Sequence, residues 1–118
     1  MVQIARGLRR DLVRVAFMDW FGIEAAAADV LVALWERPGG SVSIADFPHG
    51  RAPALPLTAN ALEVRICGLR KAMDSEAVDT LGGGLYALTE VGEAECAQAL
   101  RNTAAAINRA ARVCERAA

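Results

Sequence analysis

The segment LRKAMDSEAVDTLGGGLYALTEVG, residues 69–92, holds the pattern that decides the fold. It reads as the end of a helix, a strand at 78–81, a tight turn, a second strand at 85–88, and the start of another helix. Three consecutive glycines, Gly82, Gly83 and Gly84, separate the two strands. Glycine adopts the backbone angles that tight turns require, so the segment predicts a two-stranded hairpin behind a helix.

The helix before this hairpin is predicted over residues 59–73, with Thr58 as its N-cap. Its apolar residues step by four, three and four along one side, namely Leu62, Ile66, Leu69 and Met73. If that stripe faces the core, the opposite side presents Asn60, Val64, Cys67, Gly68 and Lys71, with Arg65 and Arg70 on its flanks. The sequence therefore predicts a modestly basic helix surface next to a hairpin.

Two helices are predicted before this region. The first covers 2–19 and keeps one face apolar, with Ile4, Leu8, Leu12 and Val15 at helical spacing. A row of arginines occupies another face, at Arg6, Arg10 and Arg14. Phe17 and Val13 lie off the apolar stripe, so we expect this helix to contact two neighbours before Gly22 ends it. The second helix covers about 24–36, with Val30, Leu31, Leu34 and Trp35 on its apolar face, and the sequence RPGG ends it.

The segment between the second helix and Thr58 has little regular structure in this reading. Val42 is predicted to lie in a short strand, and Ser43 to cap a brief helical turn. The loop 48–57 contains three prolines in ten residues. His49, the single histidine, lies in this loop with no nucleophile at a suitable spacing, so we interpret it as a loop residue rather than a catalytic base.

The last helix is predicted over 90–115, with Thr89 as its cap. Along this helix runs an apolar seam with heptad spacing, formed by Ala97, Leu100, Ala104, Ile107, Ala111 and Cys114. This seam can pack on helix 2–19 within one chain or on a second copy. Because both terminal helices are amphipathic, we expect a homodimer formed through residues 2–19 and 90–115.

Composition limits the classes of protein that fit. The 118 residues suffice for one domain, and the net charge of −1 means that any nucleic-acid binding depends on a local patch. Three separated cysteines without a CxxC motif favour a reducing compartment over disulfides or a zinc site. There is no apolar run of the ~18–20 residues that a membrane span needs, and arginines interrupt the N-terminal segment, so we expect a cytoplasmic protein with no signal peptide. No nucleophile, base or metal set suggests an enzyme, and no cofactor is expected.

Three motifs together resemble the winged helix-turn-helix output domain of OmpR/PhoB-type response regulators. They are ADVLVALWERPGGSVSIADF at 28–47, ALEVRICGLRKAM at 61–73, and TLGGGLYAL at 80–88 with its tyrosine, Tyr86. The terminal helices, and YALTEVGEAE at 86–95, are similar to dimeric regulators of the MarR or PadR kind. The resemblance implies a single mainly α domain over 1–118 with a small β wing, divided into an N-terminal helix (1–21), a winged-helix core (23–89) and a C-terminal helix (90–118). No receiver domain is present in the sequence, so control by phosphorylation of that type is not implied.

The resemblance also implies DNA binding in transcriptional control, with helix 59–73 in the major groove and the turn of the wing on the adjacent backbone. The residues that would contact DNA are Thr58, Asn60, Val64, Arg65, Cys67, Arg70, Lys71, Gly82, Gly83 and Gly84. The arginines that the family usually carries near Cys67, Gly68 and the wing are absent. An adaptor that docks a regulatory protein and binds no DNA is the alternative. Loop 48–57 lies where the resembled family contacts RNA polymerase, so it is a candidate contact for polymerase or another regulator.

Overall fold

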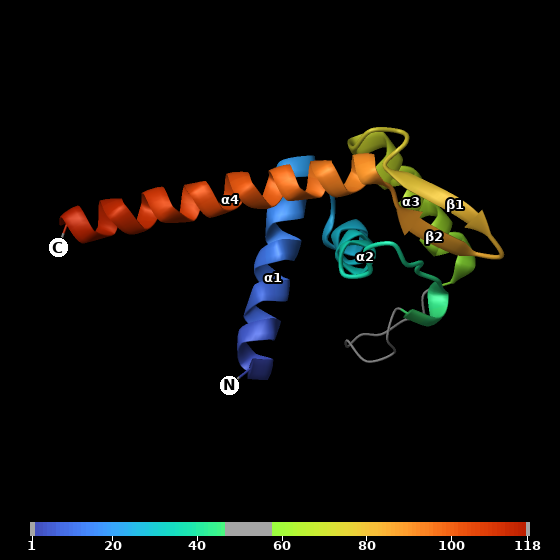
Figure 1. Ribbon diagram of the computed structural model, residues 1–118, viewed down its shortest axis with the longest axis horizontal. Helices are drawn as coiled ribbons and strands as arrows, with labels where there is room; N and C mark the ends of the chain where they lie inside the picture. The colour runs from blue at the N-terminus through green and yellow to red at the C-terminus, as the bar shows by residue number, and fades with distance from the viewer. Residues whose placement is uncertain (1, 47–57, 118) are drawn as a thin grey trace.

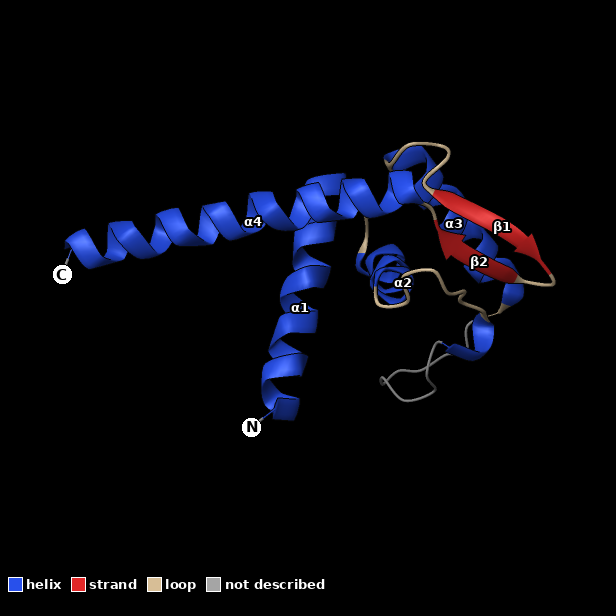
Figure 2. Ribbon diagram, in the orientation of Figure 1, coloured by secondary structure: helices blue, strands red, loops and turns tan. Residues whose placement is uncertain are grey.

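The structure is a computed structural model that describes residues 2–46 and 58–117, with side chains described at 9–46, 58–110 and 112. It is mainly helical with one small antiparallel sheet (Figures 1 and 2). The elements are α1 (Val2–Phe21), α2 (Ala25–Trp35), a single 3-10 turn η1 (Ile44–Asp46), α3 (Ala59–Ala72), β1 (Val78–Gly82), β2 (Leu85–Leu88) and α4 (Glu90–Ala117). The predicted mainly α fold with a two-stranded sheet is therefore confirmed.

Helix α2 lies at the centre of the core. It contacts α1 on one side and α3 and β2 on the other, as its position between them in Figure 1 shows. Its residues from Val30 to Leu34 are all buried, which fits a short helix made almost entirely of alanine and large aliphatic residues. Trp35 is half-buried at its end and meets the ring of Phe17 edge to face at a centroid distance of 6.4 Å.

The longest apolar stripe of α1 is not the face that the helix buries. Leu12 and Val15, both in that stripe, are 53% and 54% exposed, whereas Phe17 is 0% exposed. Phe17 also packs on Phe21, so an aromatic cluster seats the C-terminal part of the helix on α2. Burying a phenylalanine removes more apolar surface from water than burying a leucine or a valine, so this face is the more favourable one to cover. As expected, α1 contacts two neighbours, α2 and α4, and it ends at Gly22, whose φ is +65°.

The hairpin has the predicted strands and turn. Val78 pairs with Leu88 and Thr80 with Tyr86, and the register shifts between Thr80 and Gly82, where Leu81 is an extra residue. Gly83 and Gly84 have φ of +62° and +77°, as a two-residue turn of the mirror-image type requires. Val42 forms an isolated antiparallel bridge with Tyr86, so the predicted short strand at Val42 becomes a one-residue third strand.

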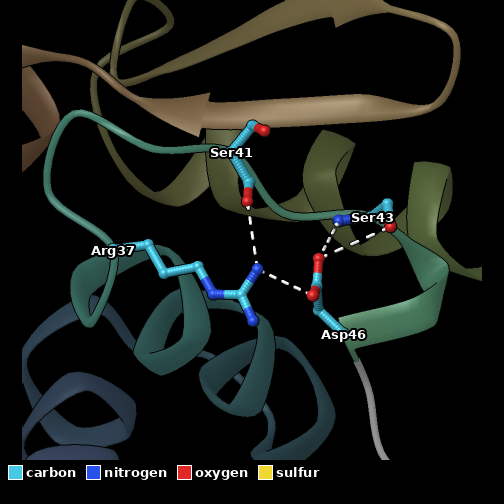
Figure 3. Close-up of polar contacts among 4 residues, drawn as sticks. All are labelled: Arg37, Ser41, Ser43 and Asp46. Atoms are coloured by element: carbon cyan, nitrogen blue, oxygen red, sulfur yellow. Dashed lines mark hydrogen bonds and ion pairs between the residues drawn. The ribbon is translucent and has the colours of Figure 1, made fainter.

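The segment that follows α2 is held by a small polar cluster (Figure 3). The guanidinium of Arg37 donates to the Ser41 carbonyl at 3.2 Å and forms an ion pair with Asp46 at 2.7 Å. The Asp46 carboxylate in turn accepts from the backbone N–H of Ser43 at 2.7 Å. Ser43 begins the helical turn, as expected, but its side chain does not accept from the backbone of the turn. Instead the Asp46 carboxylate accepts from Ser43, whose hydroxyl also donates to it at 3.4 Å. The cluster fixes the chain on both sides of Val42.

The first half of α4 belongs to the core, and its second half extends beyond α1 (Figure 1). Gly92, Cys96 and Ala99 are buried, whereas Ala104 and Ile107 of the predicted seam are exposed. The seam is thus turned partly away from the face that packs within the chain. Burial raises the pKa of the Cys96 thiol to about 12, with smaller contributions from the charges of Glu95 and Glu93, so Cys96 is a neutral core residue. The side chain of Cys114 is not described.

Candidate functional site on α3 and the hairpin

Helix α3 has the orientation that its periodicity predicts. Thr58 caps it, because its hydroxyl accepts from the N–H of Ala61 at 3.0 Å, and the stripe of Leu62, Ile66, Leu69 and Met73 is buried. The opposite side is exposed at Asn60, Val64, Cys67, Gly68 and Lys71. We call these five residues the outer face of α3. From Asn60 to Lys71 this face is about 16 Å long at the helical rise per residue.

Arg70 points away from the outer face. Its Nε and Nη2 donate to the Val78 carbonyl at 3.2 and 3.0 Å, and Nη2 also donates to the Thr80 hydroxyl at 2.6 Å. Three hydrogen bonds from one guanidinium therefore join the last turn of α3 to the first strand of the hairpin. Arg70, predicted as a contact to a partner, is instead a brace between two elements of the fold.

The remaining cations near the outer face are few. Lys71 is exposed on it, and Arg65 is half-buried on the flank opposite Arg70. The exposed acidic residues of α3, the following turn and β1 outnumber them: Glu63, Asp74, Glu76 and Asp79. The described part of this surface therefore has no excess of positive charge.

The tip of the hairpin is apolar and uncharged. Gly82, Gly83 and Gly84 are exposed there, and they are bordered by Leu81, which is 54% exposed, and by Leu85. The tip can offer a partner only backbone groups and aliphatic side chains. Leu81 and Leu85 were not among the predicted contact residues. The sequence signal that could have identified them is their position on either side of the three glycines of the hairpin turn.

An open hollow of about 690 Å³ lies beside β1 and the start of α4. Its lining includes Arg70, Thr80, Glu76, Asp79 and Glu90. Among the described residues no group of acidic, histidine or cysteine side chains is arranged to hold a metal ion. The hollow offers no convergent set of reactive groups, so the outer face of α3 remains the better candidate site.

Two arginines of the α1 row, Arg10 and Arg14, are also engaged within the chain. Arg10 forms an ion pair with Glu36 at 3.0 Å, and Arg14 forms one with Asp29 at 3.6 Å. These pairs join α1 to α2, so Arg10 and Arg14 could contact a nucleic-acid backbone only if the pairs were broken. Loop 48–57, with His49 and Arg51, lies outside the described residues, as does its expected contact to another protein.

Comparison with protein-family models gives no match for this chain, and neither the curated proteins nor the solved structures with which it was compared match it. In the described part of the chain, every helix is too short or too polar to cross a lipid bilayer.

Proposed function

We propose that this protein binds double-stranded DNA as a winged helix-turn-helix regulator of transcription, with α3 in the major groove. The observation that carries the proposal is the uncovered outer face of α3, about 16 Å long, lying beside a hairpin that Arg70 holds at a set distance. A major groove about 12 Å wide accepts one α-helix, and a rigid neighbouring hairpin then reaches the adjacent backbone. We expect it to act in the cytoplasm, because its three separated cysteines favour a reducing compartment.

The order of elements supports this reading. Helix α2 is followed by the Val42 bridge, the turn η1, α3 and the hairpin, and Val42 pairs with Tyr86 on β2. A helix, a short strand, a turn, a reading helix and a two-stranded wing occur in this order in the winged helix-turn-helix fold that the sequence resembles. The polar cluster around Arg37 and Asp46 keeps the short strand in register.

The residues take different roles in the proposed complex. Asn60 reads a base, because an asparagine side chain forms paired hydrogen bonds with adenine. Lys71 and Arg65 contact phosphates, and Gly82, Gly83 and Gly84 offer backbone N–H groups to the neighbouring strand. Thr58 caps α3, while Val64 and Cys67 contact base edges or sugars. Loop 48–57 is the proposed contact for RNA polymerase or another regulator.

The small number of cations sets the expected affinity. Each phosphate neutralised by a lysine or arginine lowers log K by about 0.9 per tenfold rise in salt, and this term dominates non-specific binding. With Lys71, Arg65 and few others available, one copy binds weakly. Useful affinity then requires two copies on two half-sites.

The test is a pull-down of genomic fragments at low salt, followed by a salt titration on an enriched fragment. Lys71→Glu should reduce affinity by about 10-fold or more, because it removes a phosphate contact and adds a repulsive charge. Arg101→Glu is the matched control: it makes the same change of charge at an exposed position on α4 and should alter affinity less than about 2-fold. No enriched fragment at low salt, or equal losses for the two variants, would refute the proposal.

A second candidate is the docking of a regulatory protein on the same surface, without DNA. It is favoured by one observation: Val64, at the centre of the outer face, is 63% exposed, and the nearby hairpin tip exposes Leu81 and Leu85. Exposed apolar groups among acidic residues suit a protein partner better than a phosphate backbone. Val64→Asp should abolish docking of such a partner, whereas on DNA it should weaken binding no more than Lys71→Glu does.

A further inference from the structure

We propose that two copies of this chain pair by laying the free half of α4 of each copy on the outer stripe of α1 of the other. The outer stripe is the exposed apolar face of α1 that contains Leu12 and Val15. The free half is residues 104–117 of α4, with Ala104 and Ile107 on its seam. Neither of these two faces belongs to the core of one chain, and the pairing does not depend on DNA binding.

The outer stripe of α1 is available to a partner. Leu12 and Val15 lie on the side of α1 opposite Phe17, and both are about half exposed among the described residues. In most surface helices the longest apolar stripe is the buried one. Here the core takes the aromatic face, so a second apolar face on the same helix remains available for a partner.

The free half of α4 also exposes an apolar face. Ile107 is 49% exposed, and Ala104, three residues before it, gives a partner helix room to approach closely. The radius of gyration is 15.6 Å, against about 13.5 Å expected for a compact chain of this length, and the longest dimension is 55 Å. A projecting helix of about 14 residues is marginally stable in water by itself, so packing against a partner is what would keep it helical.

A second copy fits both faces by charge and by area. In the described residues, the free half carries exposed Arg109 and Arg112, and the outer stripe is flanked by two exposed carboxylates, Asp11 and Asp19, and by one arginine, Arg9. Helix α1 is about 30 Å long and the free half about 21 Å, and each is about 10 Å wide. Since the free half can cover only its own length of α1, each face buries about 210 Å², which gives about 420 Å² on each copy and about 840 Å² in the pair, the size of a weak interface.

The proposed pairing is compatible with two-fold symmetry. If α4 of one copy lies on α1 of the second, a two-fold axis places α4 of the second on α1 of the first. Both the outer stripe and the free half are then covered at once in each copy. The pair is closed, with its two α3 outer faces left free.

The experiment measures the mass of the purified full-length protein in solution by sedimentation equilibrium, without DNA. The wild-type chain should be a dimer. Leu12→Asp combined with Ile107→Asp should raise the dissociation constant by about 100-fold or more, because each aspartate is present twice in the pair and would be buried without a partner. Val64→Asp is the control, since it places one such charge at an exposed apolar position on α3, and it should remain dimeric.

Circular dichroism of each variant separates dissociation from unfolding, and Leu12→Ser with Ile107→Ser provides a milder pair of changes. A monomeric wild-type chain at tens of micromolar would overturn the proposal. A dimer that the α1 and α4 variants leave intact would also overturn it, as would dissociation of the Val64→Asp control to the same extent. Because no nucleic acid is present, failure of DNA binding does not affect any of these results.

Discussion

Arg70 and Lys71 are neighbours in the sequence and carry the same charge, but they have different roles. Successive residues on a helix are turned by 100°, so only one of two adjacent side chains can point straight outward. Lys71 lies on the outer face of α3, whereas Arg70 reaches the Val78 carbonyl and the Thr80 hydroxyl on β1. The planar guanidinium can serve several acceptors at once, which suits Arg70 to the task of joining two elements.

Asp46 gives a prediction about pH at the residue scale. The hydrogen bond from the Ser43 backbone N–H, aided by Arg37, holds the pKa of Asp46 below its usual value of 3.8. Since the folded-state pKa is lowered, the stabilisation is present above about pH 4 and is lost as the pH falls through the folded-state pKa. Asp46→Asn should therefore lower the free energy of unfolding by about 1 kcal/mol at pH 7.

Urea unfolding of wild type and variant at pH 7 and pH 3 measures this effect. The difference between the two proteins should shrink at pH 3, where Asp46 in the unfolded chain is already protonated. A difference that stays constant between the two pH values would show that the carboxylate charge contributes nothing.

At the scale of elements, the junction between the hairpin and α4 is tightly packed. The Thr89 hydroxyl donates to the Glu76 carbonyl at 2.7 Å and accepts from the Gly92 N–H at 3.2 Å, so it caps α4 and anchors the turn before β1. A Cβ built on Gly92 would overlap the Ala77 carbonyl oxygen and lie 2.5 Å from the Leu88 Cδ1. Glycine at this position allows α4 to start against the base of the hairpin.

This packing predicts opposite results for two glycine substitutions in helices. Gly92→Ala should destabilise the protein by about 1–3 kcal/mol, because backbone atoms must move to admit a methyl group. Gly68→Ala should stabilise it by up to about 1 kcal/mol, because that site is open and alanine favours a helix. Thermal unfolding of the two variants at one protein concentration decides the matter, and stabilisation by Gly92→Ala would contradict the packing described.

At the scale of the whole molecule, the chain is more extended than its core requires. The principal dimensions are 55 × 31 × 23 Å, and the excess length is the free half of α4 (Figure 1). If a second copy covers this half, folding and pairing are linked, and stability depends on protein concentration.

The midpoint of thermal unfolding should therefore rise when the protein concentration is raised 100-fold, by a few degrees for a chain of this length. Leu12→Asp combined with Ile107→Asp should remove that dependence and leave a lower midpoint that does not change with concentration. A wild-type midpoint that is the same at all concentrations would argue against linked folding and pairing.

The sequence alone determined the local features: Thr58 as a cap, Gly22 as a stop, the glycine turn between two strands, and the inward stripe of α3. Each depends on backbone angles or spacing within a few residues, so neighbours elsewhere in the chain cannot change it easily. Only the tertiary structure decided which apolar face of α1 is buried, where the seam of α4 points, and that Arg70 binds β1. Those outcomes depend on which distant surface offers the larger apolar area or an unpaired carbonyl, and such competition is settled only when the elements pack together.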